Sequence, residues 1–208
     1  VPANRPKKAY GKVKLTESCG VFGSLDRLSK PIHSDVPKCM ESYGEGYGYI
    51  LYRTTLNRDY NDVPLTFESL GDRAQIYVND KLFGVVYVND DELKINISAQ
   101  KGDVLSVLCE NMGRANFGAK MMRKKGIAGR CLFDNRVHFN WDVYTMPMDN
   151  LEKIPFENKE FKEKSAFYRG YINIENPKDT FLKHSDFTKG FVTFNGFNLG
   201  RYWEIGPQ

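Results

Sequence analysis

The sequence predicts an all-β protein made of two β-sandwiches, of which the second is expected to be incomplete at its C-terminus. Three observations lead to this fold class. Apolar and polar residues alternate in short stretches bounded by Gly, Asn or Asp, as in strands with one buried face. Helical periodicity is weak along the whole chain. Several residues recur at one fixed spacing, which is the signature of a duplicated domain.

The N-terminal segment, residues 1–39, is expected to be a strand and linker region. It holds a strand-like stretch at 11–15 and a turn-rich stretch at 30–38. Because the second sandwich is short of strands, the segment could lend its strand to that sandwich. We therefore expect residues 1–39 to pack with the second sandwich.

The first sandwich is expected to span residues 40–145. Its clearest strands lie at 73–80, 93–98 and 104–109, where apolar side chains fall on every second position. The acidic run Asp90–Glu92 lies in a predicted turn. Adjacent residues of a turn point in different directions, so these carboxylates are not expected to flank one glycosidic bond as a paired acid and base.

The second sandwich is expected at residues 146–208, and the first part of this range, 150–164, is expected to be a polar connector. Tyr52-Arg53, Asn79 and Gly84 recur 116 residues later as Tyr168-Arg169, Asn195 and Gly200. Asn195-Gly196 lies between two apolar stretches and predicts a type I′ hairpin turn. At the same spacing, the strands at 93–97 and 104–109 would have their counterparts from residue 209 onwards. The second sandwich is therefore expected to lack its last strands.

The composition excludes several classes of protein. Hydrophobic residues make up 41% and charged residues 27% of 208 residues, which is typical of a folded domain and not of a disordered chain. The net charge of +4 is spread along the chain, so nucleic acid is not predicted as a partner. No apolar run approaches the roughly 18 residues that a membrane helix needs, so no membrane is predicted as a partner either. The four cysteines, at 19, 39, 109 and 131, have no Cys-x-x-Cys spacing, so no zinc site and no disulfide framework is compelled.

No catalytic residues, metal ligands or cofactor are predicted, because no motif for them occurs. The three histidines lack the context of a nucleophilic triad, and the glycines at 44, 46 and 48 do not form a dinucleotide-binding loop. The basic run at 120–126 is expected to be a solvated loop. Tyr202 and Trp203 could stack on a sugar ring, although core packing is the more common use of such residues.

The stretch at 110–118, ENMGRANFG, has the character of a binding loop. It follows a predicted strand, and it combines Arg114, Asn116 and Phe117 with two glycines. Glycines let the backbone bend sharply, and loops on a rigid sandwich commonly carry binding residues.

These motifs together resemble the C-terminal, non-catalytic β domains of glycoside hydrolase family 35 β-galactosidases. The resemblance rests on AYGKVKL, YGYILYRTTL, DRAQIYVND, ENMGRANFG, AFYRG and KGFVTFNGFNLGRYW, which occur in the family's order. It implies galactose-binding-domain-like jelly rolls and a parent enzyme that hydrolyses terminal β-galactosides. The two catalytic glutamates of that enzyme belong to a (β/α)8 barrel that this chain does not contain.

The resemblance further implies that this chain supports the catalytic barrel and lines its substrate pocket. Arg114, Asn116 and Phe117 are then expected to lie beside the galactoside substrate, with Phe117 where the family usually has Tyr. Arg114 is expected to anchor the loop and not to touch substrate. Two alternatives stay open, an autonomous carbohydrate-binding module and a purely structural docking domain. The compartment and a homo-oligomeric state are left undecided.

Overall fold

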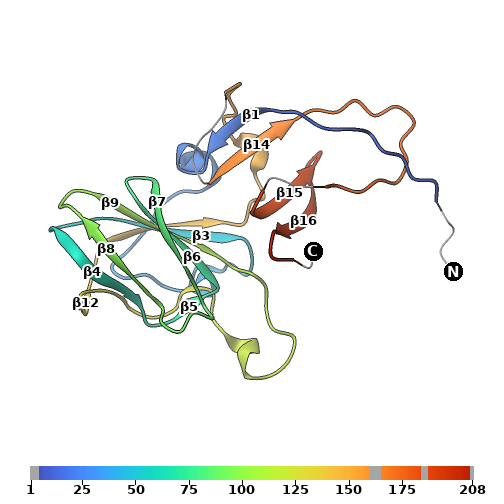
Figure 1. Cartoon of the computed structure of the whole chain (residues 1–208). Coiled ribbons are helices and arrows are strands. Elements are labelled where there is room, and N and C mark those ends of the chain that lie inside the picture. The colour runs from blue at the N-terminus through green and yellow to red at the C-terminus, as the bar shows by residue number, and fades with distance from the viewer. Residues whose placement is uncertain (1–4, 160–164, 184–186, 207–208) are drawn as a thin grey trace. The chain divides into compact units, whose positions relative to one another are not determined.

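The computed structural model describes residues 5–159, 165–183 and 187–206 and is built almost entirely from strands (Figure 1). Strands hold 44% of the residues and helices 9%, so the all-β prediction is confirmed. The strands are β1 (Leu15–Gly20), β2 (Ile32–Ser34), β3 (Tyr49–Thr55), β4 (Tyr60–Phe67), β5 (Leu70–Gly71), β6 (Arg73–Val78), β7 (Lys81–Tyr87), β8 (Lys94–Ala99), β9 (Val104–Glu110), β10 (Gly126–Ile127), β11 (Cys131–Phe133), β12 (Arg136–Val137), β13 (Trp141–Met146), β14 (Ala166–Gly170), β15 (Lys189–Phe194) and β16 (Phe197–Trp203).

The helical elements are single turns. They are η1 (Phe22–Ser24), α1 (Leu25–Leu28), η2 (Met40–Tyr43), η3 (Ala119–Met122) and η4 (Leu151–Lys153). Of the expected connector at 150–164, the described part holds only η4, and residues 160–164 lie outside the described residues. No helix in the described ranges is long and apolar enough to cross a membrane.

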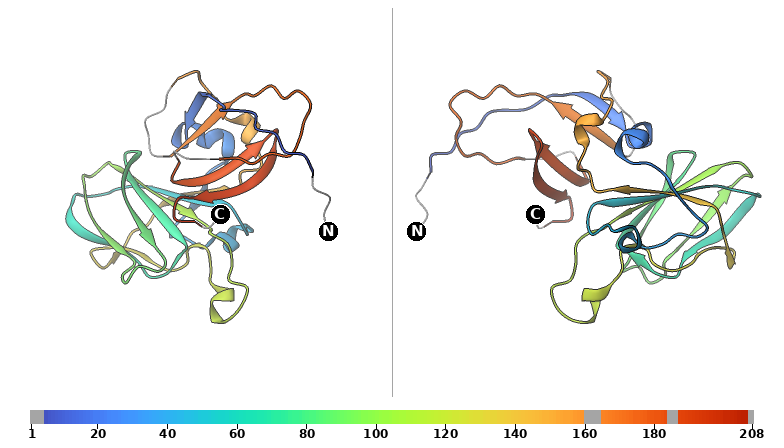
Figure 2. Two further views of the ribbon diagram at one scale, coloured as in Figure 1. Left: turned by 45° about the vertical axis from the view of Figure 1, so that its right-hand side comes forward. Right: turned by 180° about the vertical axis from the view of Figure 1, so that it is seen from behind.

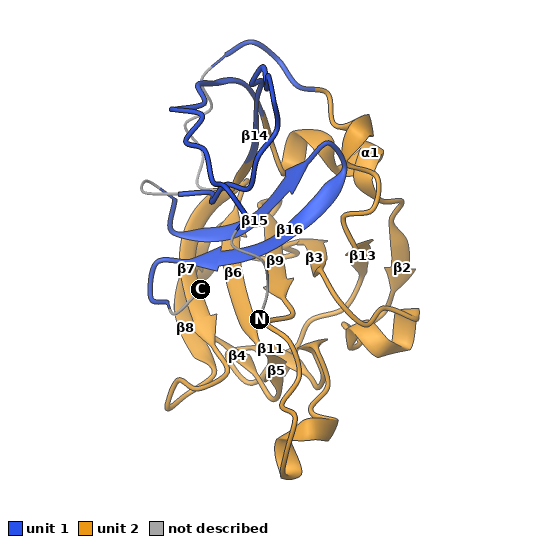
Figure 3. Ribbon diagram, turned by 90° about the vertical axis from the view of Figure 1, so that its right-hand side faces the viewer, with its two compact units in different colours: residues 1–18, 156–160, 167–208 blue, residues 19–155, 161–166 orange. Residues whose placement is uncertain are grey.

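The chain divides into two compact units, coloured separately in Figure 3. Unit 1 comprises residues 1–18, 156–160 and 167–208, and unit 2 comprises residues 19–155 and 161–166. Each unit is described by itself below.

Unit 2 is a β-sandwich with two main sheets (Figure 2). One sheet has six strands in the order β2-β13-β3-β9-β6-β7, and the other has four in the order β12-β11-β4-β8. The inner faces of both sheets contribute to a single cluster of buried side chains. From the six-stranded sheet come Ile50, Tyr52, Ile76, Leu105, Val107 and Val143, and from the four-stranded sheet Leu65, Phe67, Ile97, Cys131 and Phe133. All four cysteines carry free thiols, and burial raises the pKa values of Cys109 and Cys131.

Tyr52 places a polar group in the middle of this core. Its hydroxyl donates a hydrogen bond to the Lys38 carbonyl at 2.7 Å and accepts one from the Ile127 N–H at 3.1 Å. Burial raises the pKa of this fully buried phenol, so it stays neutral. Gly126 has a φ of +76° and lies so close to the Tyr52 hydroxyl that a Cβ would clash with it. The residue before Ile127 must therefore be glycine for β10 to approach Tyr52.

His138 and Trp141 close one end of the same core. The indole N–H of Trp141 donates to the His138 carbonyl at 3.0 Å. The Thr54 hydroxyl donates its single hydrogen to the Asn140 carbonyl at 2.8 Å. In its 2.9 Å hydrogen bond with His138 Nε2 the hydroxyl oxygen is therefore the acceptor. Burial, and secondarily the nearby Arg58, lower the pKa of His138. The imidazole is therefore neutral and structural.

Unit 1 contains the two-stranded sheet β15-β16 and most of the two-stranded sheet β1-β14, of which Cys19, Gly20 and Ala166 are assigned to unit 2. Residues near the start of the chain also bond to a later segment, since the Lys8 N–H donates to the Asp179 carbonyl at 3.0 Å. The β15-β16 hairpin turns at Asn195 and Gly196, whose φ angles are 47° and 81°. Positive φ at both central residues is the type I′ geometry, so this prediction is confirmed.

The hairpin of unit 1 repeats a hairpin of unit 2. β15 and β16 begin and end 116 residues after β6 and β7 (73 to 189 and 81 to 197). Even the register shift recurs: it falls between Ile76 and Tyr77 in the first hairpin and between Val192 and Thr193 in the second. The first turn has positive φ at Asn79 and Asp80, where the second has Asn195 and Gly196. The repeat in the sequence is therefore a structural repeat.

Replacing Tyr52 by Phe tests the role of the buried hydroxyl. The change leaves the buried Ile127 N–H without its acceptor, so the free energy of unfolding should fall by about 1–3 kcal/mol. Urea unfolding of the chain measures it. The matched control is Tyr47→Phe: Tyr47 is exposed and bonds Asp149 at the surface, so its loss should cost below about 1 kcal/mol. Equal effects of the two changes would contradict this account of the core.

Candidate functional site

The loop of residues 112–125 projects from unit 2. It follows β9, contains the short η3 turn, and returns to the sandwich at β10; both views in Figure 2 show it extending away from the sheets. We call these residues the 112–125 loop. They include Arg114, Asn116 and Phe117 of the predicted binding stretch.

A buried ion pair holds the two ends of this loop together. Lys125 Nζ lies 2.5 Å from Asp72 Oδ2, with side chains 4% and 10% exposed. The same Asp72 oxygen accepts the Met112 N–H at 2.8 Å, and the Lys125 ammonium also donates to the Gly113 carbonyl. Lys125 belongs to the basic run predicted to be solvated. That prediction is wrong at this position, because the lysine leaves water to pair with Asp72.

Arg114 adds a second set of contacts near the base of the loop. Its Nη2 bonds Glu41 Oε1 at 2.6 Å, and its Nη1 donates to the Arg123 carbonyl at 3.2 Å. Both Glu41 oxygens also accept the Lys125 N–H at 3.2 Å. Partial burial raises the pKa of Glu41, but the hydrogen bonds from Arg114 and from the backbone outweigh it, so the pKa is lowered. Glu41 is thus ionised at neutral pH.

Asn111 fixes the point where the loop leaves β9. It is buried, its amide donates to the Gly46 carbonyl at 2.8 Å, and its carbonyl oxygen accepts the Gly113 N–H at 3.0 Å. The predicted binding stretch includes Arg114, but the sequence did not point to Glu41, which bonds Arg114, or to Asp72 and Lys125, which form the buried ion pair. Asp72 and Glu41 come from distant parts of the chain, and no local pattern marks them.

The far part of the loop is exposed and carries large apolar side chains. Phe117 is 88% exposed and Met122 is 81% exposed, and Asn116 beside them is also exposed. None of these three side chains belongs to the core of unit 2. The structure therefore separates the predicted site residues into Arg114, which bonds to the base of the loop, and Asn116 with Phe117, which face outward.

Tyr202 and Trp203 do not form one sugar-stacking surface. They are adjacent in β16, where successive side chains point to opposite faces. Lys189 Nζ lies over the Trp203 ring at 4.3 Å, and the Tyr202 ring lies 6.0 Å from that of Phe187. Both residues are partly buried.

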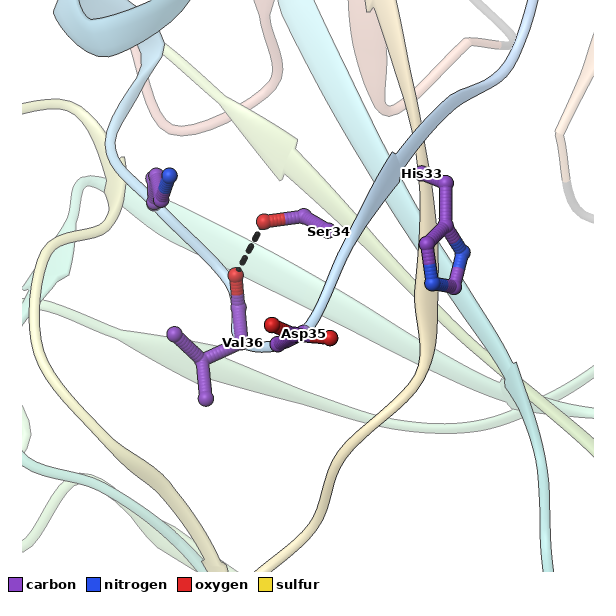
Figure 4. Close-up of a pocket in the computed structure, with 5 residues that line it drawn as sticks. His33, Ser34, Asp35 and Val36 are labelled. Carbon is purple, nitrogen blue, oxygen red and sulfur yellow. Dashed lines mark hydrogen bonds between the residues drawn. The ribbon is translucent and has the colours of Figure 1, made fainter.

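A shallow pocket of about 290 Å³ lies beside β2, lined by His33, Ser34, Asp35, Val36 and Lys38 (Figure 4). The Ser34 hydroxyl donates to the Val36 carbonyl at 2.7 Å, and His33 points away from it (Figure 4). His33 instead pairs with Asp142 at 3.5 Å on an exposed surface. The serine and the histidine therefore do not form a nucleophile and its base.

Two family models match the chain. One, described as "Beta-galactosidase, first all-beta domain", matches residues 37–147, which is more than half of the chain. The other, described as "Beta-galactosidase, galactose-binding domain", matches residues 165–208. The 112–125 loop lies within the first match, and the β15-β16 hairpin lies within the second.

Curated relatives agree with these matches. The chain is 37% identical to a β-galactosidase of Xanthomonas manihotis over 93% of its own length. It is 34% identical to β-galactosidases of Macaca fascicularis and Homo sapiens over 100% of its length. It spans only about a third of these relatives, with 32% to 35% of each covered. The matched all-β domain, the galactose-binding domain and these relatives together show that the chain belongs to the β-galactosidase family, of which it represents non-catalytic β domains.

Proposed function

We propose that this chain supports the catalytic barrel of a β-galactosidase and that its 112–125 loop lines the substrate pocket of that barrel. The parent enzyme hydrolyses terminal β-galactosides, and this chain contributes no catalytic group. The observation that carries the proposal is a loop that exposes Phe117 and Met122 and is held by a buried ion pair.

The energetics of that ion pair support a role for the loop outside unit 2. Removing a carboxylate and an ammonium from water costs several kcal/mol per ion, which only close pairing and further hydrogen bonds can offset. The Lys125–Asp72 pair has both, because Met112 and Gly113 supply backbone partners. These contacts hold the loop in place without burying its own Phe117 or Met122. A fixed loop with exposed apolar groups is suited to contact another surface.

The chemistry of the exposed residues is consistent with contact to a sugar-binding pocket. Phe117 offers an aromatic face on which the C–H surface of galactose can stack, but it has no hydroxyl to hydrogen-bond the sugar. Asn116 beside it has both a donor and an acceptor. Arg114 is occupied by Glu41 and Arg123, so it acts as a positioning residue.

The second candidate is an autonomous carbohydrate-binding module. It is favoured by the printed description of the model that matches residues 165–208, which names a galactose-binding domain. It is weakened by Tyr202 and Trp203, which point to opposite faces of β16.

Calorimetric titration and a binding assay distinguish the two candidates. We expect the chain alone to show no binding to galactose or lactose at millimolar concentration and to release no galactose from a β-galactoside. We expect it to associate with a separately expressed catalytic barrel, and Phe117→Ala to weaken that association or the activity of the complex. Millimolar or tighter sugar binding by the chain alone, without association with the barrel, would favour the module.

Replacing Lys125 by Met tests the ion pair that holds the loop. The change leaves the Asp72 carboxylate buried without its partner, so the free energy of unfolding should fall by about 3–5 kcal/mol. Lys124→Met is the matched control, because Lys124 is exposed, and it should change stability by less than about 0.5 kcal/mol. Adding Asp72→Asn to Lys125→Met should restore part of the loss. If the two lysine variants were equally stable, the buried pair would not hold the loop.

Replacing Arg114 by Lys tests the second anchor. A lysine has no planar fork, so it cannot bond Glu41 and the Arg123 carbonyl together. A double-mutant cycle with Glu41→Gln should give a coupling of about 0.5–1 kcal/mol at pH 7. Because the pKa of Glu41 is lowered in the folded state, its ionisation stabilises the fold above the ordinary value of 4.5. The coupling should therefore disappear as the pH falls through the lowered pKa.

The kinetics of the full-length parent enzyme complete the test of Arg114. The Arg114→Lys variant should change KM more than kcat if the loop positions substrate-contacting residues. Unchanged stability together with unchanged kinetics would count against an anchoring role.

A further inference from the structure

The 112–125 loop carries more positive charge than the whole chain. It has five basic residues and no acidic residue, whereas the net charge of the chain is +4. Subtracting the five charges of the loop leaves the rest of the chain with a net charge of −1. We expected the positive charge to be spread along the chain, but it is concentrated in this loop.

Two of the five cations are neutralised at the base of the loop. They belong to the buried Lys125–Asp72 pair and to the Arg114–Glu41 pair. The other three form no ion pair and no side-chain hydrogen bond with the residues that the structure describes. We call these three residues the loop cations: Lys120, Arg123 and Lys124.

The backbone that carries the loop cations is held by hydrogen bonds. The η3 turn is closed by the Met121 N–H, which donates to the Gly118 carbonyl at 3.1 Å. The Arg123 N–H then donates to the Lys120 carbonyl at 3.2 Å, and the Arg123 carbonyl accepts a hydrogen bond from Arg114. The three side chains therefore start from fixed points, and little backbone entropy is lost when a ligand binds them.

The side chains of the loop cations are accessible to a ligand. Lys120 and Lys124 are exposed, and Arg123 is partly buried. Their combined charge attracts an anion, and the planar guanidinium of Arg123 can donate two parallel hydrogen bonds to a carboxylate or a sulfate. Phe117 and Met122 of the same loop are 88% and 81% exposed and offer apolar contact. The loop therefore combines the groups that bind a ligand with an apolar face and a negative charge.

The two exposed lysines favour a small ligand in a pocket open to water over an acidic protein surface. Lysine is depleted in protein–protein interfaces, because burying its ammonium group is costly. In a pocket that is open to water, the ammonium group keeps most of its hydration and still attracts a nearby negative charge. The proposed function gives the loop such a position.

We propose that the loop cations bind a negatively charged group of the substrate and make the parent enzyme selective for anionic β-galactosides. The charged group is a carboxylate or a sulfate, either on the galactose or on the group linked to it. This inference rests on the proposed function, because it requires the loop to line the substrate pocket. It adds to that function a class of substrate and the residues that select it.

The test compares two pairs of substrates with the full-length parent enzyme. In the first pair, 4-carboxyphenyl and 4-carbamoylphenyl β-galactoside, the charge lies on the leaving group. In the second pair, 4-nitrophenyl β-galactoside and its galactose 6-sulfate, the charge lies on the galactose. The assays are run at about pH 6, where a carboxylate is ionised. Within each pair, kcat/KM for the charged substrate divided by kcat/KM for the uncharged one is the charge ratio.

Replacing each loop cation by Gln should lower the charge ratio of at least one pair about tenfold, chiefly through KM for the charged substrate. Values of kcat/KM for the uncharged substrates should stay within about twofold. The matched control is the combination of Lys81→Gln, Lys101→Gln and Arg136→Gln, which removes the same charge at exposed positions outside the loop. It should leave both charge ratios unchanged. Intrinsic differences in reactivity within a pair cancel, because each variant is compared with the unchanged enzyme.

Screening by salt gives a second readout. The Debye length falls from about 10 Å at 0.1 M salt to about 3 Å at 1 M. The charge ratio of the unchanged enzyme should therefore fall toward that of the triple variant as salt is added. This measurement needs no substitution, so it tests the proposal even if the triple variant is unstable.

Three outcomes would overturn the proposal. One is a charge ratio that is the same in the unchanged enzyme and in the triple variant. Another is an equal loss in the triple variant and in the control, because the effect would then come from net charge and not from the loop. The third is weaker association of the triple variant with the barrel at an unchanged charge ratio, which would assign the loop cations to an acidic protein surface.

Failure of the proposed function gives a different result. If Phe117→Ala changed neither the association with the barrel nor the activity, the loop would not line the pocket. If Phe117→Ala acted as expected while the charge ratios did not depend on the loop cations, only the selectivity for anionic substrates would be wrong.

Discussion

The ion pair between Lys125 and Asp72 is the constraint on which the 112–125 loop depends. Asp72 immediately precedes β6, and Lys125 immediately precedes β10, so the pair ties the return of the loop to the central sheet. Its side chains also bond the two ends of the loop, at the Met112 N–H and the Gly113 carbonyl, and the Lys125 N–H bonds Glu41. Neither residue belongs to the hydrophobic cluster that forms the core of unit 2. An interaction of such cost is best explained by the position that it gives to the exposed residues.

The duplicated hairpin shows which structural features depend on the local sequence and which depend on tertiary contacts. The same strand limits, the same register shift and the same positive-φ turn arise in two different surroundings. Asn79 and Asn195 both adopt a left-handed conformation that asparagine tolerates better than most residues. The local sequence is therefore sufficient for the hairpin. Burial is not local, because Val192 is only partly buried whereas its counterpart Ile76 is fully buried.

The parts of the structure that could be predicted from the sequence are those with a local signal. Alternation in residues 73–80 and 104–109 predicted β6 and β9, and Asn195-Gly196 predicted the turn. The base of the loop could not be predicted in this way, because Lys125 looks like a member of a solvated basic run and its partner Asp72 is 53 positions away. The opposite orientation of Tyr202 and Trp203, by contrast, follows from the alternation of side chains in the second strand of the predicted hairpin. Contacts between residues far apart in the sequence, and not composition, determine the structure at the base of the loop.

The central claim is that the exposed tip of the 112–125 loop faces the catalytic barrel of a β-galactosidase. The most direct measurement is photo-crosslinking with a photoreactive amino acid in place of Phe117, in a complex of this chain with a separately expressed barrel, read by mass spectrometry. The account predicts crosslinks to barrel residues around the substrate pocket, which a competing galactoside reduces, and no such crosslinks from the same amino acid in place of exposed Phe139. Crosslinks from position 117 that fall elsewhere on the barrel, or none at all in a complex that forms, would contradict it.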